Sequence, residues 1–370
     1  MEYRTFGRTG WRASAIGLGT EYLLNQPPQV MERVIQMAAD AGINYVDLLY
    51  SGPRFWNDFA PVFKSHRHKF MAAAHWGVGQ EGEQLTNVRE MDVCHRFFDQ
   101  TLAHLGNDYA DVGMLMMVDT EQLWDTWGQE SLQRLARYKE QGRIGAIGMS
   151  SHKAAPTLKA VNSGLIDVLM YPVNLAAQTT AGNQAVLEAC ARQNVGVVAM
   201  KPYAGGAFFL PDQSVVLFWF RAGGSALQVS KPRPLTPSQC LSYVLSQRVA
   251  TIVPGVKNAD ELAQTLHYLD ATDAEKDFSA AVASVQPYPM GQCIYCNHCL
   301  PCPADIDIGR TIHLFDQAQA GVTRQMRAEY AALPARASDC TECGVCMERC
   351  PYEVDVPGKM RAAARLFESL

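Results

Sequence analysis

The stretch LWDTWGQESLQRLARYKEQGRIGAIGMS, residues 123–150, shows how this chain is built. Apolar residues recur at helical spacing from Leu123 to Leu135, and Gly142 stands where a helix C-cap favours a positive φ. The short apolar run Ile144–Met149 follows directly. A strand that is apolar on both faces and alternates with helices is typical of a parallel sheet with both sides covered. The stretch therefore predicts one helix–strand unit of an α/β fold.

The same alternation continues over roughly the first 270 residues. Amphipathic stretches separate eight short apolar runs: Ser14–Leu18, Ile43–Leu48, Phe70–Ala74, Val112–Met117, Ile144–Met149, Val168–Val173, Val195–Met200 and Val249–Val253. Eight such units in this length match a (β/α)₈ TIM barrel, whose active sites lie at the C-terminal ends of the strands. A doubly wound sheet usually has fewer strands, and its Gly-x-Gly-x-x-Gly fingerprint is missing after the first run. We therefore predict a TIM barrel.

Composition excludes several classes of function. The chain has 370 residues, of which 48% are hydrophobic, and a formal net charge of −5. This charge lacks the basic surplus of a nucleic-acid-binding protein. No apolar run approaches the ~20 residues that span a bilayer, and the first residues lack the apolar stretch of a signal peptide. We expect a cytoplasmic protein with no nucleic-acid or membrane partner.

The length favours two domains rather than one. A connection of about fifty residues between Met200 and Val249 is long for a barrel, and long loops at its C-terminal face often carry function. A surface insertion with a small core of its own is the alternative. Proline-rich sequence precedes a cysteine-rich tail. We place the barrel at residues 1–285 and a second domain at residues 286–370.

Eight of the eleven cysteines lie between Cys293 and Cys350. They form one Cys-x₂-Cys-x₂-Cys-x₂-Cys-Pro motif from Cys293 and one Cys-x₂-Cys-x₂-Cys-x₃-Cys-Pro motif from Cys340. Without an export signal, metal ligation is a better interpretation than a disulfide framework. In two-cluster ferredoxins the fourth cysteine of each run binds the other iron–sulfur cluster. Structural zinc, the alternative, generally uses separated cysteine pairs.

An internal repeat supports this pairing, because Cys302–Ile308 aligns with Cys350–Val356 without a gap. We therefore predict two [4Fe–4S] clusters. The two ligand sets are Cys293, Cys296, Cys299 and Cys350, and Cys302, Cys340, Cys343 and Cys346. The other three cysteines lie in helical, apolar patterns and are predicted to be core residues: Cys94, Cys190 and Cys240.

Several segments together resemble a known group of enzymes: Tyr3–Gly10, Ile16–Thr20, Gly42–Asp47, Ile147–His152, Met200–Gly206 and Val253–Lys257. With its tail, the chain resembles the ferredoxin-containing branch of the aldo/keto reductase superfamily over nearly its whole length. The resemblance implies a (β/α)₈ barrel, a substrate pocket at the C-terminal ends of the strands, and carbonyl reduction by NADPH.

The family's mechanism uses an Asp, a Tyr acid, a Lys that lowers the pKa of the Tyr, and a His near the carbonyl. Asp47 matches the Asp, whereas Tyr50 follows it by three residues instead of five. His75 stands in the place of the Lys, and Met116 in the place of the His. We expect Asp47, Tyr50 and His75 to handle protons at the barrel mouth.

The residues that would bind nicotinamide are also altered. Ser150 and Asn174 match the family, but Met200 aligns with the aromatic residue on which nicotinamide stacks. Lys257 is a candidate contact for a cofactor phosphate. Lys201 is a candidate contact for a phosphate or an anionic substrate group, with an outward-facing salt bridge as its alternative. If NADPH binds, these are its predicted contacts.

The complete cysteine motifs and the altered catalytic residues favour an iron–sulfur oxidoreductase. Its two clusters would pass electrons between an external carrier (a ferredoxin, a flavodoxin or a reductase) and a small organic substrate at the barrel mouth. An NADPH-dependent carbonyl reductase with displaced catalytic residues is one alternative. A non-catalytic electron-relay subunit is another.

Overall fold

The computed structural model describes residues 1–81, 84–209, 234–282, 291–293, 295, 299–350 and 352–368. The chain divides into two compact units, one made of Met1–Pro202 with Pro237–Asp277 and the other of Tyr203–Thr236 with Phe278–Leu370. The domain boundary predicted at residue 285 lies outside the described residues, as does much of the long connection after Met200.

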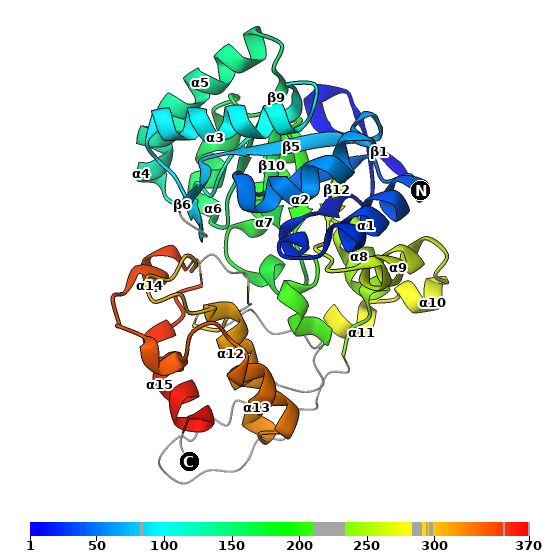
Figure 1. Cartoon of the computed structure of the whole chain (residues 1–370). Coiled ribbons are helices and arrows are strands. Elements are labelled where there is room, and N and C mark those ends of the chain that lie inside the picture. Colours follow the sequence, from blue (N-terminus) through cyan, green and yellow to red (C-terminus); the bar gives the residue numbers. More distant parts are fainter. Residues whose placement is uncertain are drawn as a thin grey trace. The chain divides into compact units, whose positions relative to one another are not determined.

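The first unit is built on a sheet of eight parallel strands (Figure 1). In chain order they are β3 (Leu18–Gly19), β4 (Tyr45–Leu48), β5 (Met71–Trp76), β8 (Ala110–Leu115), β9 (Ile144–Ser150), β10 (Val168–Pro172), β11 (Gly196–Met200) and β12 (Thr251–Val253). Each strand pairs with the next, and parallel bridges from Ile16 to Ile252 and from Gly19 to Gly255 close the ring. The predicted eight-strand parallel barrel is confirmed.

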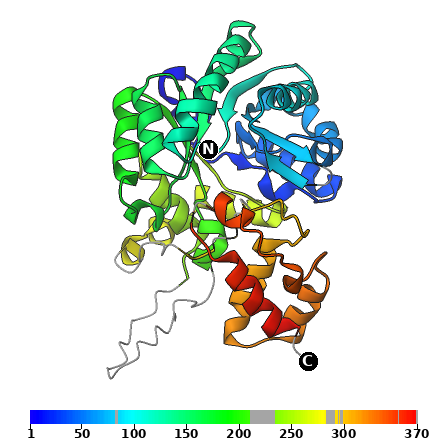
Figure 2. The same ribbon diagram turned by 90° about the vertical axis from the view of Figure 1, so that its left-hand side faces the viewer.

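Helices follow the strands and surround them (Figures 1 and 2). The main ones are α1 (Pro28–Asp40), α2 (Pro53–Lys64), α3 (Met91–His104), α5 (Gln129–Glu140), α6 (Ala154–Asn162), α7 (Asn183–Gln193), α8 (Pro237–Leu245) and α9 (Ala259–Leu266). Each buries an apolar stripe against the sheet, as α1 does with Met31, Val34, Ile35 and Ala38.

The single helix predicted from Leu123 is interrupted. The short helix α4 (Glu121–Leu123) leads into a π-helical segment, Trp124–Gly128, before α5 begins. The wider turn places both Trp124 and Trp127 in buried positions, 2% and 6% exposed. The prediction of helical structure from Leu123 is therefore confirmed, but the spacing of the apolar residues does not reveal the extra residue in the π-helical turn.

The first predicted strand, Ser14–Leu18, is also divided. Its beginning belongs to β2 (Arg12–Ser14), which pairs antiparallel with β1 (Tyr3–Thr5), and only β3 enters the barrel. This hairpin carries Phe6, which is fully buried in the barrel interior and packs edge-on against Tyr45 at 5.4 Å between ring centroids. The hairpin thus places one large apolar side chain in the barrel interior.

A second hairpin was not predicted. It consists of β6 (Val78–Glu81) and β7 (Gln84–Asn87) and comes directly after β5. The chain turns at Gly77, where φ is 98° and a Cβ would lie 2.8 Å from both Arg89 and Trp127. Val78 then packs against Met116 and Met117 of the loop after β8.

Gly148 permits dense packing inside the barrel. A Cβ at this residue would lie 2.7 Å from Met114 Sδ and 2.9 Å from Val112 Cγ1. We expect Gly148→Ala to lower the free energy of unfolding by about 1–3 kcal/mol, because the added methyl overpacks the interior. Denaturant unfolding followed by tryptophan fluorescence measures the change. An unchanged midpoint would show that Met114 moves aside freely.

The second unit repeats one motif. Helices α12 (Ile308–Gln317) and α15 (Val356–Phe367) both begin after an N-cap aspartate, Asp307 or Asp355, whose side chain accepts a backbone N–H. Asp305 and Glu353, two residues before the caps, both have a φ of 55°. The two helices pack together (Figure 1), and α13 (Arg324–Ala331) and α14 (Val345–Arg349) complete the unit.

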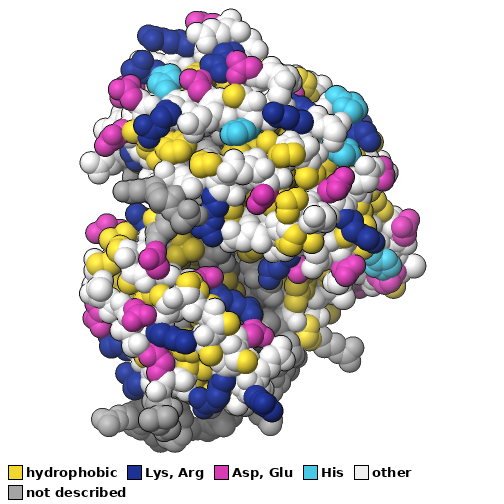
Figure 3. Space-filling model, in the orientation of Figure 1, with side chains coloured by type: hydrophobic (Ala, Val, Ile, Leu, Met, Phe, Trp, Pro, Cys, Tyr) yellow, Lys and Arg dark blue, Asp and Glu magenta, His cyan; other side chains and the backbone are white. Residues whose placement is uncertain are grey.

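The visible surface carries both signs of charge, with Lys and Arg side chains interspersed among Asp and Glu (Figure 3). Among the described residues, no helix is long and apolar enough to cross a membrane.

Candidate functional site

Asp47 and His75 form a hydrogen-bonded pair at the C-terminal ends of two neighbouring strands. Asp47 on β4 lies opposite Ala73 on β5, and His75 follows Ala73 by two residues. Since Tyr45 and Ala73 belong to the interior cluster, the period of two places both polar side chains on the inner face. His75 Nε2 lies 2.8 Å from Asp47 Oδ1. The side chains are almost wholly buried, with His75 1% exposed.

The hydrogen bond to Asp47 decides how His75 can act. A neutral imidazole that donates from Nε2 to a carboxylate keeps an acceptor lone pair on Nδ1. His75 Nδ1 is buried and has no hydrogen-bond partner among the described residues. A carboxylate that orients an imidazole and stabilises its protonated form is the arrangement used in catalytic triads. The pair is therefore suited to accept and return a proton at Nδ1.

Thioether side chains line the interior around this pair. Met114 and Met170 are buried in the interior cluster, and the partly buried Met200 packs against it. Met116, which the resemblance aligns with the family's His, is 8% exposed and packs with Val78 and Met117. Thioethers are weak acceptors and donate no hydrogen bond. A carbonyl oxygen would find no proton donor at Met116.

Tyr50 lies in a different environment from the Asp47–His75 pair. Its ring contacts Phe55 at 5.6 Å between centroids, and its charged neighbours are Glu21 and Arg54. Burial, reinforced by the Glu21 carboxylate, raises the pKa of Tyr50 well above its ordinary value. The tyrosine acid that the resemblance implies would need a lowered pKa instead. Tyr50 is therefore a poor general acid at neutral pH, although its hydroxyl can donate a hydrogen bond.

The two residues predicted to hold nicotinamide are bonded to the backbone. Ser150 Oγ accepts the Met117 N–H at 2.9 Å and lies 3.3 Å from the Leu115 carbonyl oxygen. Asn174 donates from Nδ2 to the Lys201 carbonyl at 2.9 Å, and its Oδ1 accepts the Ala177 N–H at 2.8 Å. Both side chains are buried. They connect neighbouring loops at this end of the barrel.

The two predicted cationic contacts lie on other loops. Lys201 follows β11 directly, with a φ of 58°. Lys257 precedes α9 and holds its ammonium group 5.9 Å from the centre of the Tyr22 ring. The Lys257 N–H donates to the Glu261 carboxylate at 2.8 Å. A carboxylate of the chain itself thus lies at the start of α9, where a cofactor phosphate would otherwise find backbone donors.

A second Asp–His pair was not predicted. Asp119 Oδ2 lies 2.9 Å from His152 Nδ1, and Asp119 Oδ1 accepts the backbone N–H of His152 at 2.6 Å and the Ser151 hydroxyl at 3.0 Å. These bonds tie the residues after β9 to the loop after β8. Both residues follow adjacent parallel strands, which is the sequence signal that would have suggested their proximity.

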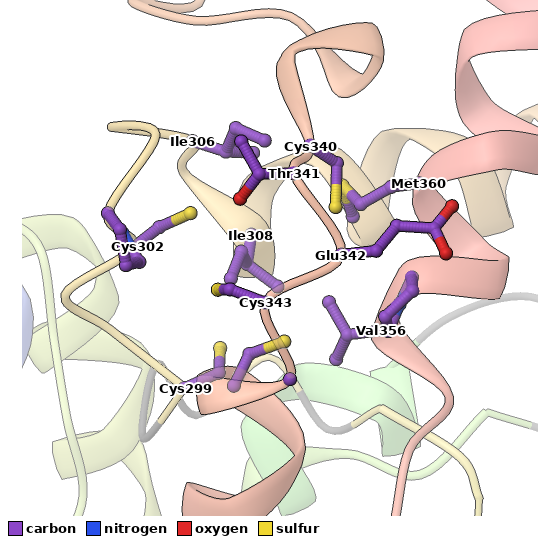
Figure 4. Close-up of a pocket in the computed structure, with 14 residues that line it drawn as sticks. Cys299, Cys302, Ile306, Ile308, Cys340, Thr341, Glu342, Cys343, Val356 and Met360 are labelled. Carbon is purple, nitrogen blue, oxygen red and sulfur yellow. The ribbon is translucent and has the colours of Figure 1, made fainter.

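Five predicted cluster ligands line one pocket in the second unit, and four of them belong to one predicted set (Figure 4). Cys302 comes from the first motif, and Cys340, Cys343 and Cys346 come from the second. The pocket has an apolar wall formed by Ile306, Ile308, Val356 and Met360. Cys299, predicted to bind the other cluster, also lines this pocket. Among the described residues, no three His, Cys, Asp or Glu form a set for a single metal ion.

The electrostatics of this pocket fit a thiolate-bound cluster. Burial raises the pKa of Cys346, and the neighbouring thiols of Cys340, Cys343 and Cys302 raise it further. Thiolates that repel one another need a compensating positive charge, which iron supplies on binding. The sulfurs of Cys302 and Cys343 in Figure 4 face the hollow between them. The residues present therefore fit the predicted group.

The other predicted ligand set is described in part. Cys293, Cys299 and Cys350 are described, whereas Cys296 lies outside the described residues. The Tyr295 N–H donates to Cys293 Sγ at 3.3 Å, and hydrogen bonds to ligand sulfurs help to set the reduction potential of an iron–sulfur cluster.

The three remaining cysteines are core residues, as predicted. Each is 1% exposed, and burial raises the thiol pKa to about 11 for Cys94 and about 12 for Cys190 and Cys240. Such thiols are unreactive at neutral pH.

Comparison with known proteins agrees with this architecture. The model of the aldo/keto reductase family matches residues 15–286, and that of the 4Fe-4S dicluster domain matches residues 292–355. No curated protein matches the chain.

Solved structures share the barrel. The aldo-keto reductase AKR11C1 from Bacillus halodurans, solved in its holo form, is 20% identical with a TM-score of 0.62, over 78% of this chain and 98% of its own. Two structures of aldo-keto reductases from Pseudomonas aeruginosa are 20% and 21% identical, with TM-scores of 0.57 and 0.56. Each covers 72% of this chain, and 96% and 95% of its own.

At these identities the likeness shows the fold, whereas the family model covers most of the chain. The dicluster domain implies two iron–sulfur clusters. The chain therefore belongs to the aldo/keto reductase family, as an oxidoreductase whose barrel domain is followed by a C-terminal 4Fe-4S dicluster domain.

Proposed function

We propose that this protein is an iron–sulfur-dependent oxidoreductase that transfers electrons one at a time between an external carrier and a small organic substrate. The substrate binds at the C-terminal end of the barrel, where the Asp47–His75 pair exchanges its protons. The observation that carries the proposal is this pair, in which His75 takes the place of the family's lysine and forms a 2.8 Å hydrogen bond.

The clusters would supply single electrons, and the chain's own residues handle the protons. In the reductive direction the substrate gains two electrons from the carrier and two protons. One proton comes from the protonated His75 at Nδ1, and the second comes from solvent. Asp47 accepts the hydrogen bond from Nε2 and stabilises the imidazolium before the transfer. The buried Met114, which lies opposite His75 on the neighbouring strand β8, excludes water from this side of the pair.

The direct test uses the intact protein under anaerobic conditions. The protein is reduced with dithionite, excess reductant is removed, and a panel of small organic acceptors is added. Reoxidation is followed by the recovery of visible cluster absorbance. Acceptors that accelerate recovery support the proposal, whereas a protein with full iron content that no acceptor reoxidises would contradict it.

The alternative is hydride transfer from NADPH. Three observations weigh against it. Ser150 and Asn174 are bonded to backbone groups, the Glu261 carboxylate lies beside Lys257, and the pKa of Tyr50 is raised rather than lowered. The first two observations bear on binding of the cofactor, and the third bears on protonation of the carbonyl oxygen.

We therefore expect no saturable NADPH binding to the purified protein. Anaerobic titration of tryptophan fluorescence with NADPH measures it, and Lys257→Ala is the matched variant. Quenching that saturates in the unmodified protein and is lost in Lys257→Ala would favour the reductase alternative.

A further inference from the structure

The two cysteine loops of the second unit carry different residues at one equivalent position. Tyr295 lies between Cys293 and Cys296, and Glu342 lies between Cys340 and Cys343. Both adopt a left-handed backbone, with φ of 56° at Tyr295 and 53° at Glu342. The local geometry is therefore repeated, while the side-chain chemistry is not.

Tyr295 and Glu342 each contact the helix that follows the Cys-Pro at the end of the same motif. The Tyr295 ring meets His313 edge-on at 4.8 Å, and its hydroxyl lies 3.1 Å from Asp316 on α12. Glu342 Oε1 accepts a hydrogen bond from Arg361 Nη1 on α15 at 2.6 Å. His313 and Arg361 are themselves equivalent, since each lies eleven positions after its motif's last cysteine.

The difference in charge between the Tyr295 and Glu342 loops lies beside one of the two predicted clusters. Glu342 lines the pocket of Cys302, Cys340, Cys343 and Cys346, and Figure 4 shows its carboxylate extending away from the sulfurs. The ion pair with Arg361 holds it there. A negative charge near an iron–sulfur cluster opposes the arrival of an electron, so the net charge beside the cluster affects its reduction potential.

We propose that Arg361, acting through Glu342, sets the reduction potential of the cluster held by Cys302, Cys340, Cys343 and Cys346. The inference rests on the cluster ligation contained in the proposed function. Arg361 is a positioning residue, because it neutralises the carboxylate and keeps it turned from the sulfurs. The first loop, with the phenol of Tyr295, has no charge at this position, so the two clusters differ in potential.

The pair is accessible to water, which limits the size of the effect. The side chains of Arg361 and Glu342 are 51% and 52% exposed. Exposed charges are screened within about 8 Å at physiological ionic strength. The shift in potential on removing Arg361 therefore grows as the salt concentration falls, a dependence that a purely structural role would not produce.

Potentiometric EPR on the intact, anaerobically purified protein tests the proposal. In Arg361→Gln, one cluster is expected to move to a more negative midpoint potential and the other to stay in place. In Glu342→Gln, the same cluster moves to a more positive potential. The double variant lies between the two, since it carries neither charge. Arg327→Gln, which removes one exposed charge from α13, is the control and leaves both potentials unchanged.

Three outcomes would overturn the inference. One is that both clusters keep their potentials in Arg361→Gln and Glu342→Gln. Another is that the same shift occurs in Arg327→Gln. The third is that Arg361→Gln loses a cluster while Glu342→Gln keeps its potential, because Arg361 would then only hold the loop. An unmodified protein without two EPR signals would instead contradict the ligation in the proposed function.

Discussion

Replacing His75 with Gln is expected to slow substrate-dependent reoxidation of the reduced protein by roughly 10²–10⁴-fold, the usual contribution of a general acid–base group. Gln keeps a polar side chain beside Asp47 but cannot carry a proton to the substrate at neutral pH. The iron content and the cluster absorbance are expected to remain unchanged, because His75 lies in the barrel unit and the cysteines lie in the other. Stopped-flow absorbance with an acceptor that reoxidises the unmodified protein measures the rate.

A matched control separates chemistry from stability. His152 also pairs with an aspartate, at 2.9 Å from Asp119; the His152 side chain is 2% exposed and that of Asp119 is 19% exposed. His152→Gln therefore disturbs a comparable Asp–His pair, which joins the loop after β8 to the residues after β9. We expect it to lower the thermal unfolding temperature without the loss of rate. Equal losses of rate in His152→Gln and His75→Gln would show that His75 supports the fold rather than the reaction.

Variants of Asp47 test the other residue of the same pair. Asp47→Asn retains the hydrogen bond but removes the charge that stabilises the imidazolium, so the rate falls while folding is largely kept. Asp47→Ala leaves the buried Nε2–H of His75 without an acceptor, and an unsatisfied buried donor costs about 1–3 kcal/mol of stability. A large loss of rate in Asp47→Asn, with a normal unfolding transition, is therefore the informative result.

The barrel could be predicted because its strands are buried on both faces. In the sequence such strands appear as short apolar runs between amphipathic helices. All eight predicted runs lie at or beside the strands of the ring. The β6–β7 hairpin could not be predicted in this way. It is an insertion in the alternating pattern, and its position depends on the turn at Gly77 and on contacts of Val78 with a distant loop.

The Asp47–His75 contact followed from the sequence only in part. Each residue was a candidate because it ends a predicted strand, and neighbouring parallel strands bring their ends together. The hydrogen bond depends on the exact register of β4 and β5, which periodicity does not define. The hydrogen bonds of Ser150 and Asn174 to the backbone depend on the positions of loops, which periodicity does not define either. The prediction that these two residues contact a cofactor therefore rested only on the resemblance to the family.

The cysteine pairing across the two motifs rests on spacing and on the internal repeat, and mutation can test it directly. Cys302→Ala is expected to remove the cluster that Cys340, Cys343 and Cys346 bind, although Cys302 belongs to the first motif. The structure supports this expectation because these four residues line one pocket. Iron analysis and EPR of the anaerobically purified variant should show the loss of one of the two clusters. Cys240→Ala, a buried cysteine outside the motifs, is the matched control and keeps both.

Double variants identify which cluster each cysteine binds. If Cys302 and Cys343 share a cluster, the double variant Cys302→Ala/Cys343→Ala retains as much iron as either single variant. If Cys302 and Cys293 serve different clusters, Cys302→Ala/Cys293→Ala loses both. If instead Cys302→Ala/Cys343→Ala loses both clusters and Cys302→Ala/Cys293→Ala loses one, each motif binds its own cluster. The pocket formed by Cys302 with the second motif would then have another role. Because Cys299 lines the same pocket, Cys299→Ala/Cys343→Ala is the remaining comparison, and we expect it to lose both clusters.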